Sequence, residues 1–135
     1  MKKTKLSLIV LLTMAAFLVP NSFAEIYELR TYTSHEGKLE SVLNRFENHT
    51  MSLFEKHGIR NVGYWVSEDQ DNTLIYIVAH ESRDSAKQSW KSFVSDPEWK
   101  QARTASLADG PIVDKIESLY MNNCLLYTSP SPRDS

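Results

Sequence analysis

The spacing of hydrophobic and polar positions changes several times between residues 25 and 123, and each change predicts a new element. Residues 26–33 are rich in β-branched and aromatic side chains, which predicts a strand. Beyond them, apolar side chains recur at spacings of three and four, which predicts an amphipathic helix. We expect Ser34 to cap this helix and Lys56-His57-Gly58 to end it. The apolar stripe comprises Leu39, Val42, Leu43, Phe46, Thr50, Leu53, Phe54 and His57.

The second half of this region repeats the alternation of strand and helix. Residues 62–67 and 73–80 are apolar runs joined by a polar segment, so they predict a β-hairpin. Ser82 is a suitable cap for a second helix. The buried face of that helix is expected to carry Ala86, Trp90, Phe93 and Val94.

A further short helix is predicted at Asp96-Pro97, because aspartate caps helices and proline is tolerated at the first helical position. Asp109-Gly110-Pro111 ends it, and residues 112–121 alternate as a last strand. The order is strand, helix, strand, strand, helix, strand, which is typical of an α+β, ferredoxin-like βαββαβ sandwich.

The two strands of the hairpin are apolar on both faces. Helices cover only one face of such a sheet, so the other face needs a cover of its own. A second copy of the chain supplies the same face by two-fold symmetry. We therefore expect a homodimer.

Composition and charge narrow the class of protein. The chain has 135 residues, with 15 Lys and Arg against 17 Asp and Glu, a net charge of −2. This balance and the absence of a basic run argue against nucleic acid and against an anionic membrane as partner. With 41% hydrophobic and 24% charged residues, the composition is that of an ordinary folded protein. Residues 25–123 are the size of one domain.

The first 24 residues have the pattern of a secretory signal peptide. A basic start is followed by an apolar run over residues 6–19 and by small residues that end at Ala24. The run is shorter than the roughly 20 residues that a membrane-spanning helix needs. We expect cleavage after Ala24 and a secreted or periplasmic protein that has no membrane contact once the signal is removed. An uncleaved anchor is the alternative.

The last residues, 124–135, are expected to be foreign to the protein. Their sequence matches the translation of an adapter DNA used to prepare sequencing libraries, and a natural Ser/Pro-rich tail is the alternative. Cys124, which is the only cysteine, lies in this segment. The domain itself is then expected to fold without disulfides.

Glu28 and Arg30 are the most informative polar residues. Two positions apart on a strand, they project from the same face, and Tyr32 continues that face. Charges inside a covered sheet must be paired, so one hypothesis is a structural salt-bridge network. The other hypothesis is a ligand anchor, in which Arg30 binds an oxyanion or phenolate and Glu28 orients it.

Three more side chains are candidates for the same ligand site. Tyr64 and Tyr76 share the predicted hairpin and are expected to line a cavity between sheet and helices. His80 ends the second hairpin strand and is expected at the mouth of that cavity. No metal or cofactor is expected: His35-Glu36 begins a zinc-protease motif, but Leu39 stands where the second histidine belongs, and no Gly-rich phosphate loop occurs. His57 is expected to cap its helix rather than to act in catalysis.

Several short blocks resemble the NIPSNAP family, in order and over nearly the whole domain. The resemblance implies a dimeric α+β barrel, in which two sheets pack face to face, and kinship with cofactor-independent monooxygenases. It implies no defined reaction, and together with an export signal it implies a bacterial protein. The blocks are Tyr27-Glu28-Leu29-Arg30-Thr31-Tyr32, Gly37-Lys38, Lys56-His57-Gly58, Val62-Gly63-Tyr64-Trp65 and Asp96-Pro97-Glu98-Trp99.

Three functions remain open from the sequence. The first is a homodimer that binds a small, partly apolar or aromatic molecule between sheet and helices. The second is a cofactor-independent monooxygenase-like enzyme, which rests on fold analogy alone. The third is a structural or interaction dimer without a ligand. Whether the protein is an enzyme stays undecided at this point.

Overall fold

The computed structural model describes residues 25–124 and residue 126, so the predicted signal peptide and most of the predicted foreign tail lie outside the described residues. Four strands form one antiparallel sheet in the order β2-β3-β1-β4. The predicted hairpin is confirmed as β2 and β3. The strands are β1 (Ile26–Ser34), β2 (Arg60–Val66), β3 (Thr73–His80) and β4 (Val113–Asn122).

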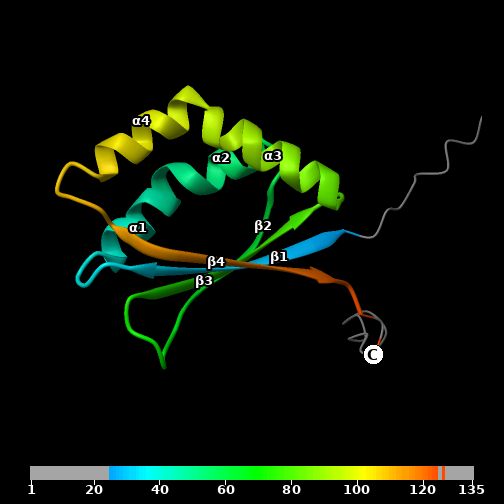
Figure 1. Ribbon diagram of the computed structural model, residues 1–135, viewed down its shortest axis with the longest axis horizontal. Helices are drawn as coiled ribbons and strands as arrows, with labels where there is room; N and C mark the ends of the chain where they lie inside the picture. Colours follow the sequence, from blue (N-terminus) through cyan, green and yellow to red (C-terminus); the bar gives the residue numbers. More distant parts are fainter. Residues whose placement is uncertain (1–24, 125, 127–135) are drawn as a thin grey trace, which may run out of the picture.

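All helices lie on one face of this sheet, and no element of the described chain covers the other face (Figure 1). The first helical stretch is continuous in sequence and contains a π-helical segment in its middle. The predicted α+β, ferredoxin-like arrangement is confirmed. The helices are α1 (Leu39–Arg45), the π-helical η1 (Phe46–Thr50), α2 (Met51–Lys56), α3 (Arg83–Ser95) and α4 (Pro97–Ser106).

The start of the first helix differs from the sequence-based prediction. Ser34 does not cap it; Ser34 is the last residue of β1, and its hydroxyl donates to the carbonyl of Asn72 at 3.1 Å. A turn with Gly37 at φ +71° follows, and α1 begins after Lys38 without a side-chain cap. The hydroxyl of Ser34 is used by the β2–β3 loop, so it is not available to the helix.

Two other helix starts are confirmed. The side chain of Ser82 accepts from the backbone N–H of Ser85, and that of Asp96 accepts from the N–H of Glu98 at 2.8 Å. One predicted core residue of α3 is wrong, because Val94 is 53% exposed. At 100° per residue Val94 lies on the rim of the stripe, outside the arc that Ala86 and Phe93 bury.

The helices bury one continuous apolar core against the sheet. The core comprises Tyr32, Val42, Phe46, Leu53, Phe54, Ile59, Leu74, Tyr76, Val78, Phe93 and Ile112.

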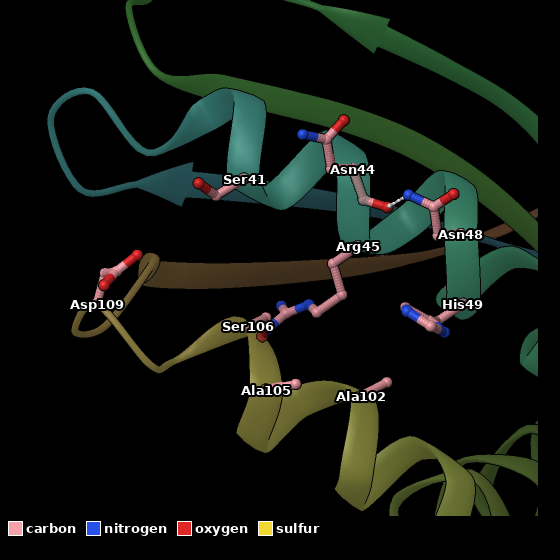
Figure 2. A pocket seen from close by; sticks show the side chains of 9 residues that line it. All are labelled: Ser41, Asn44, Arg45, Asn48, His49, Ala102, Ala105, Ser106 and Asp109. Carbon is pink, nitrogen blue, oxygen red and sulfur yellow. Dashed lines mark hydrogen bonds between the residues drawn. The ribbon is translucent and has the colours of Figure 1, made fainter.

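Two hydrogen bonds fix the first helical stretch within this layer. Arg45 connects α1 to α4, because its Nη1 donates to the Ser106 hydroxyl at 3.1 Å (Figure 2). In η1, the Thr50 hydroxyl donates to the carbonyl of Arg45 at 3.2 Å.

The opposite face of the sheet is apolar at its centre and bare of helices. Leu29 lies opposite Ile77 and Leu119 in the ladder, and Trp65 lies opposite Ile75. Trp65 is 53% exposed and Leu119 is 59% exposed. We call these five side chains and Met121 the bare face. Gly63 belongs to it too, since a Cβ there would collide with the indole of Trp65.

Candidate functional site

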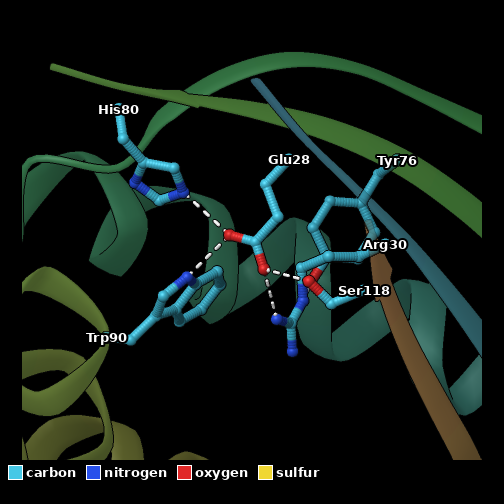
Figure 3. Close-up of polar contacts among 6 residues, drawn as sticks. All are labelled: Glu28, Arg30, Tyr76, His80, Trp90 and Ser118. Carbon is cyan, nitrogen blue, oxygen red and sulfur yellow. Dashed lines mark hydrogen bonds and ion pairs between the residues drawn. The ribbon is translucent and has the colours of Figure 1, made fainter. Parts of the chain in front are cut away.

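The Glu28 carboxylate lies at the centre of a buried polar cluster on the helix side of β1 (Figure 3). The side chain is 1% exposed, and four donors from four elements surround it. Oε2 accepts from His80 Nε2 of β3 at 2.8 Å and from Trp90 Nε1 of α3 at 2.7 Å. Oε1 accepts from Arg30 Nη1 of β1 at 2.8 Å and from the Ser118 hydroxyl of β4 at 2.7 Å.

These donors keep the carboxyl group ionised. Burial by itself raises the pKa of Glu28, but the hydrogen bonds from His80, Ser118, Arg30 and Trp90 outweigh burial and lower the pKa to about 2. The pairing of Glu28 with Arg30 that the strand spacing predicted is therefore present. It lies under the helices rather than on the bare face.

The Arg30 guanidinium is held on three sides. Nε donates to the Tyr76 hydroxyl at 2.8 Å, Nη1 binds Glu28, and the guanidinium carbon lies 4.3 Å from the centre of the Trp90 ring. In the described part of the chain, Nη2 makes no hydrogen bond, and Figure 3 shows it pointing away from Glu28. The side chain is 15% exposed, and Nη2 is its donor that remains for a ligand because the other two nitrogens are held.

The neighbourhood of Arg30 opens along β4. Ser118 lies opposite Arg30 in the ladder, and Ile116 lies opposite Tyr32, so both face the helix side of the sheet. Ser118 is nevertheless exposed, and Ile116 is 48% exposed. The helical layer therefore leaves the inner side of β4 accessible to solvent next to Arg30.

The three tyrosines of the predicted site are packing residues first. Tyr76 is fully buried. The centre of its ring lies 5.1 Å from that of Tyr64, on which it stacks, and 5.4 Å from that of Tyr32. They fill the core rather than line a cavity. Burial raises the pKa of Tyr64 and of Tyr76 above their ordinary values. Both phenols stay protonated at neutral pH, so neither is available as a general base.

His80 is buried inside the polar cluster, and it does not stand at the mouth of a cavity lined by Tyr64 and Tyr76. It is 2% exposed, its Nε2 binds Glu28, and its Nδ1 has no hydrogen-bond partner among the described residues. Of the six sequence-predicted residues, five are joined in one cluster around Glu28 and Arg30. Tyr64 reaches this cluster only through its stacking on Tyr76.

Two members of the cluster were missed by sequence reasoning. The spacing of Trp90 in α3 predicts core packing, but its indole N–H also donates to Glu28. Ser118 lies 90 residues from Glu28 in the chain, and no local pattern marks it. Apart from a buried carboxylate that needs donors, the sequence contains no signal for either contact.

His57 has the structural role that the sequence predicts. It ends α2, and its Nε2 lies 2.6 Å from Asp96, the residue that caps α4. Hydrogen bonds from Lys56 and His57 hold the pKa of Asp96 well below its usual range. Across the described residues, no group of three His, Cys, Asp or Glu side chains is arranged to hold a metal ion. Nor does any helix in these residues have the length and apolarity to cross a membrane.

Comparison with known proteins agrees with this architecture. A NIPSNAP family protein of unknown function from Agrobacterium tumefaciens superimposes with a TM-score of 0.67 at 24% identity, covering 78% of this chain and 93% of that one. A NIPSNAP-like domain protein from Burkholderia xenovorans gives 0.67 at 15% identity, with 82% and 93% covered. SnoaB, a cofactor-independent oxygenase from Streptomyces nogalater, gives 0.53 at 18% identity, with 80% and 99% covered.

These solved structures establish the fold, and family membership comes from the sequence. A search of curated proteins found no relative. The sequence profile of the NIPSNAP family matches residues 27–125, which is most of the chain and includes every residue of the polar cluster. The chain therefore belongs to the NIPSNAP family.

Proposed function

We propose that this protein is a homodimer that binds a small, partly apolar or aromatic anion between its sheet and its helices, with Arg30 as the anchor. The observation that carries the proposal is the free Nη2 of a guanidinium whose other nitrogens are already held. A fork fixed in this way binds an oxyanion or phenolate at low entropic cost. Trp90 and Ile116 supply apolar surface beside it.

The same network also explains why the anchor needs Glu28. A lone buried guanidinium is costly, and the ionised Glu28 offsets its charge. One carboxylate neutralises one guanidinium, so the pair has no net charge. A ligand anion then interacts with a neutral, oriented pair, which favours weak or moderate binding and ready exchange.

The homodimer is the second part of the proposal, and the bare face supports it. A contiguous apolar patch on a soluble protein marks an interaction surface. A second copy with the same face gives a two-fold arrangement, with the helices outside and the polar clusters away from the interface. Export to the periplasm or the cell exterior, after cleavage behind Ala24, completes the proposal as an expectation from the sequence.

Titration with 4-nitrophenolate tests the anchor, because its absorbance reports on the environment of the phenolate oxygen. We expect saturable binding that Arg30→Met weakens by about tenfold or more, with native mass still that of two chains. Arg60→Met is the matched control, since Arg60 forms an exposed ion pair with Glu25 at 2.7 Å. Unchanged affinity in Arg30→Met contradicts the proposal.

Other outcomes of the same experiment lead to the alternatives. Loss of the dimer in Arg30→Met without any ligand effect favours a structural network. Consumption of oxygen with a phenolic substrate, abolished by Tyr76→Phe or His80→Gln, favours the oxygenase alternative. The raised pKa of Tyr76 argues against that alternative at neutral pH.

A further inference from the structure

A second arginine under the helices, Arg45, lacks the acidic partner that Arg30 has. It is the last residue of α1 and is only 7% exposed. Nη1 donates to the Ser106 hydroxyl at 3.1 Å, and the guanidinium carbon lies 5.1 Å from the centre of the Trp99 ring. Nε is buried and has no hydrogen-bond partner among the described residues.

No described carboxylate forms an ion pair with Arg45. Burial lowers the pKa of Arg45, and the nearby charge of Arg103 acts in the same direction. A buried cation beside a second cation is destabilising unless something neutralises it. The fork geometry of a guanidinium suits a carboxylate or phosphate oxygen pair.

Arg45 and Arg103 both line a cavity of about 360 Å³. Leu107, Ile112 and Ile116 make much of the rest of its wall apolar, while Asp114 adds one carboxylate. The volume is in the range of small-molecule sites. Asp114 repels a dianion more than a monoanion, and the apolar wall favours a ligand with a hydrocarbon body.

We propose that Arg45 and Arg103 bind the carboxylate of a small monocarboxylic acid, whose apolar body lies against Leu107, Ile112 and Ile116. The ligand carboxylate then supplies the counter-charge that the two cations lack among the described residues. The π-helical segment η1 starts directly after Arg45, and such segments are frequent at functional sites. This site goes beyond the anchor at Arg30, since it rests on a different arginine that Glu28 does not neutralise.

Benzoate is the probe, with benzamide as its uncharged counterpart and inorganic phosphate at about pH 8, where it is mainly a dianion, as the doubly charged comparison. The side-chain Nε–H resonance of Arg45 in ¹H–¹⁵N spectra reports on the surroundings of this guanidinium. We expect benzoate to shift this resonance saturably, whereas benzamide and phosphate leave it in place. Equal shifts with benzamide or phosphate overturn the assignment of the ligand class, and absence of any shift with benzoate overturns the site.

Variants separate a binding role from a structural one. Arg45→Met is expected to weaken benzoate binding by about tenfold or more. Without ligand, it should leave the urea midpoint unchanged or raise it, because it removes an uncompensated buried charge. Arg103→Met, at an exposed position, keeps the test valid if Arg45→Met fails to fold: it should weaken binding by about threefold or more at unchanged stability.

Lys87→Met is the matched control, since Lys87 is an exposed cation on α3 outside this cavity. A lowered urea midpoint in Arg45→Met together with unchanged benzoate affinity in Arg103→Met overturns the proposal. Arg30→Met distinguishes the two anion sites. If only Arg30→Met loses benzoate binding, the acid binds at Arg30 and the site at Arg45 is overturned. If only Arg45→Met loses it, the site at Arg45 is supported, and the Arg30 proposal depends on the 4-nitrophenolate titration.

Discussion

The two faces of the sheet have similar apolar side chains and opposite surroundings. On the helix side, Tyr76, Leu74 and Val78 of β3 are at most 1% exposed. On the other side, neighbouring positions of the same sheet leave Trp65 and Leu119 more than half exposed. A strand alternates its side chains between faces, so an apolar residue in either phase points to a cover on that side. The chain supplies one cover itself, and the other is expected from a second copy.

The two faces of the sheet also differ in where their charged side chains lie. The helix side contains the ionised Glu28 and Arg30, which four elements enclose. The centre of the bare face is apolar, and its exposed ion pair of Lys115 and Glu117 lies further along β4. An apolar centre with charge displaced from it is typical of a surface that associates.

The largest expected effect is the loss of unfolding free energy when a core residue on the helix side of the sheet is truncated. Phe54 is fully buried among the rings of Phe46, Tyr76, Trp90 and Phe93. Phe54→Ala should lower the free energy of unfolding by about 3–5 kcal/mol in urea denaturation, because it leaves a cavity in the core. Leu119→Ala, measured at concentrations low enough for single chains, should change it by only about 0.5 kcal/mol. Equal losses contradict the difference between the faces.

Next in size is the loss of the buried carboxylate. The pKa of Glu28 is lowered from 4.5 to about 2, so folding favours the ionised form. Its contribution is complete above pH 4.5 and is lost as the pH falls toward 2. Glu28→Gln should therefore cost about 3 kcal/mol at pH 7 and flatten the acid limb of stability against pH. An acid limb of unchanged slope in Glu28→Gln contradicts this assignment.

A smaller effect is expected from a charge on the bare face, and it concerns the dissociation constant of the proposed dimer. Leu119→Lys places a charge twice in a two-fold interface. It should raise the dissociation constant about tenfold or more, which is about 1.4 kcal/mol, in sedimentation velocity over a dilution series. Val94→Lys adds the same charge to the outer side of α3, where Val94 is 53% exposed, and should not change association. A similar response of both variants would argue against the bare face as the interface.

The smallest effect concerns an exposed ion pair, Arg60 with Glu25, whose side chains are 49% and 43% exposed. Arg60→Met should change the free energy of unfolding by about 1 kcal/mol or less, because solvent screens the pair. Thermal or urea unfolding of Arg60→Met and Arg30→Met under the same conditions compares the exposed pair with the buried one. A loss as large as that of Arg30→Met contradicts the assignment of the buried pair as the stronger one.

Most of the fold follows from local patterns in the sequence. Runs of apolar, β-branched and aromatic residues place all four strands, and an apolar period of three to four places the first helical stretch. Ser82 and Asp96 mark helix starts because their side chains bond within three residues. The prediction that Ser34 caps the first helix was wrong because of a contact that is distant in sequence. Its hydroxyl is bound to Asn72, 38 residues away, and that contact exists only once the sheet has formed.

The site was less predictable than the fold. The pairing of Glu28 with Arg30 follows from their spacing on one strand. The contacts of Trp90 and Ser118 depend on packing between elements that lie 62 and 90 residues from Glu28. The isolation of Arg45 was equally invisible, because a helical pattern does not reveal which cations lack a counter-ion in the folded chain.

The central claim is that a second copy covers the bare face, and native mass spectrometry of the purified protein tests it most directly. At micromolar concentration the account predicts the mass of two chains. Leu119→Lys should raise the share of single chains, while Val94→Lys should leave that share unchanged. A wild-type protein with the mass of a single chain at that concentration would contradict the claim.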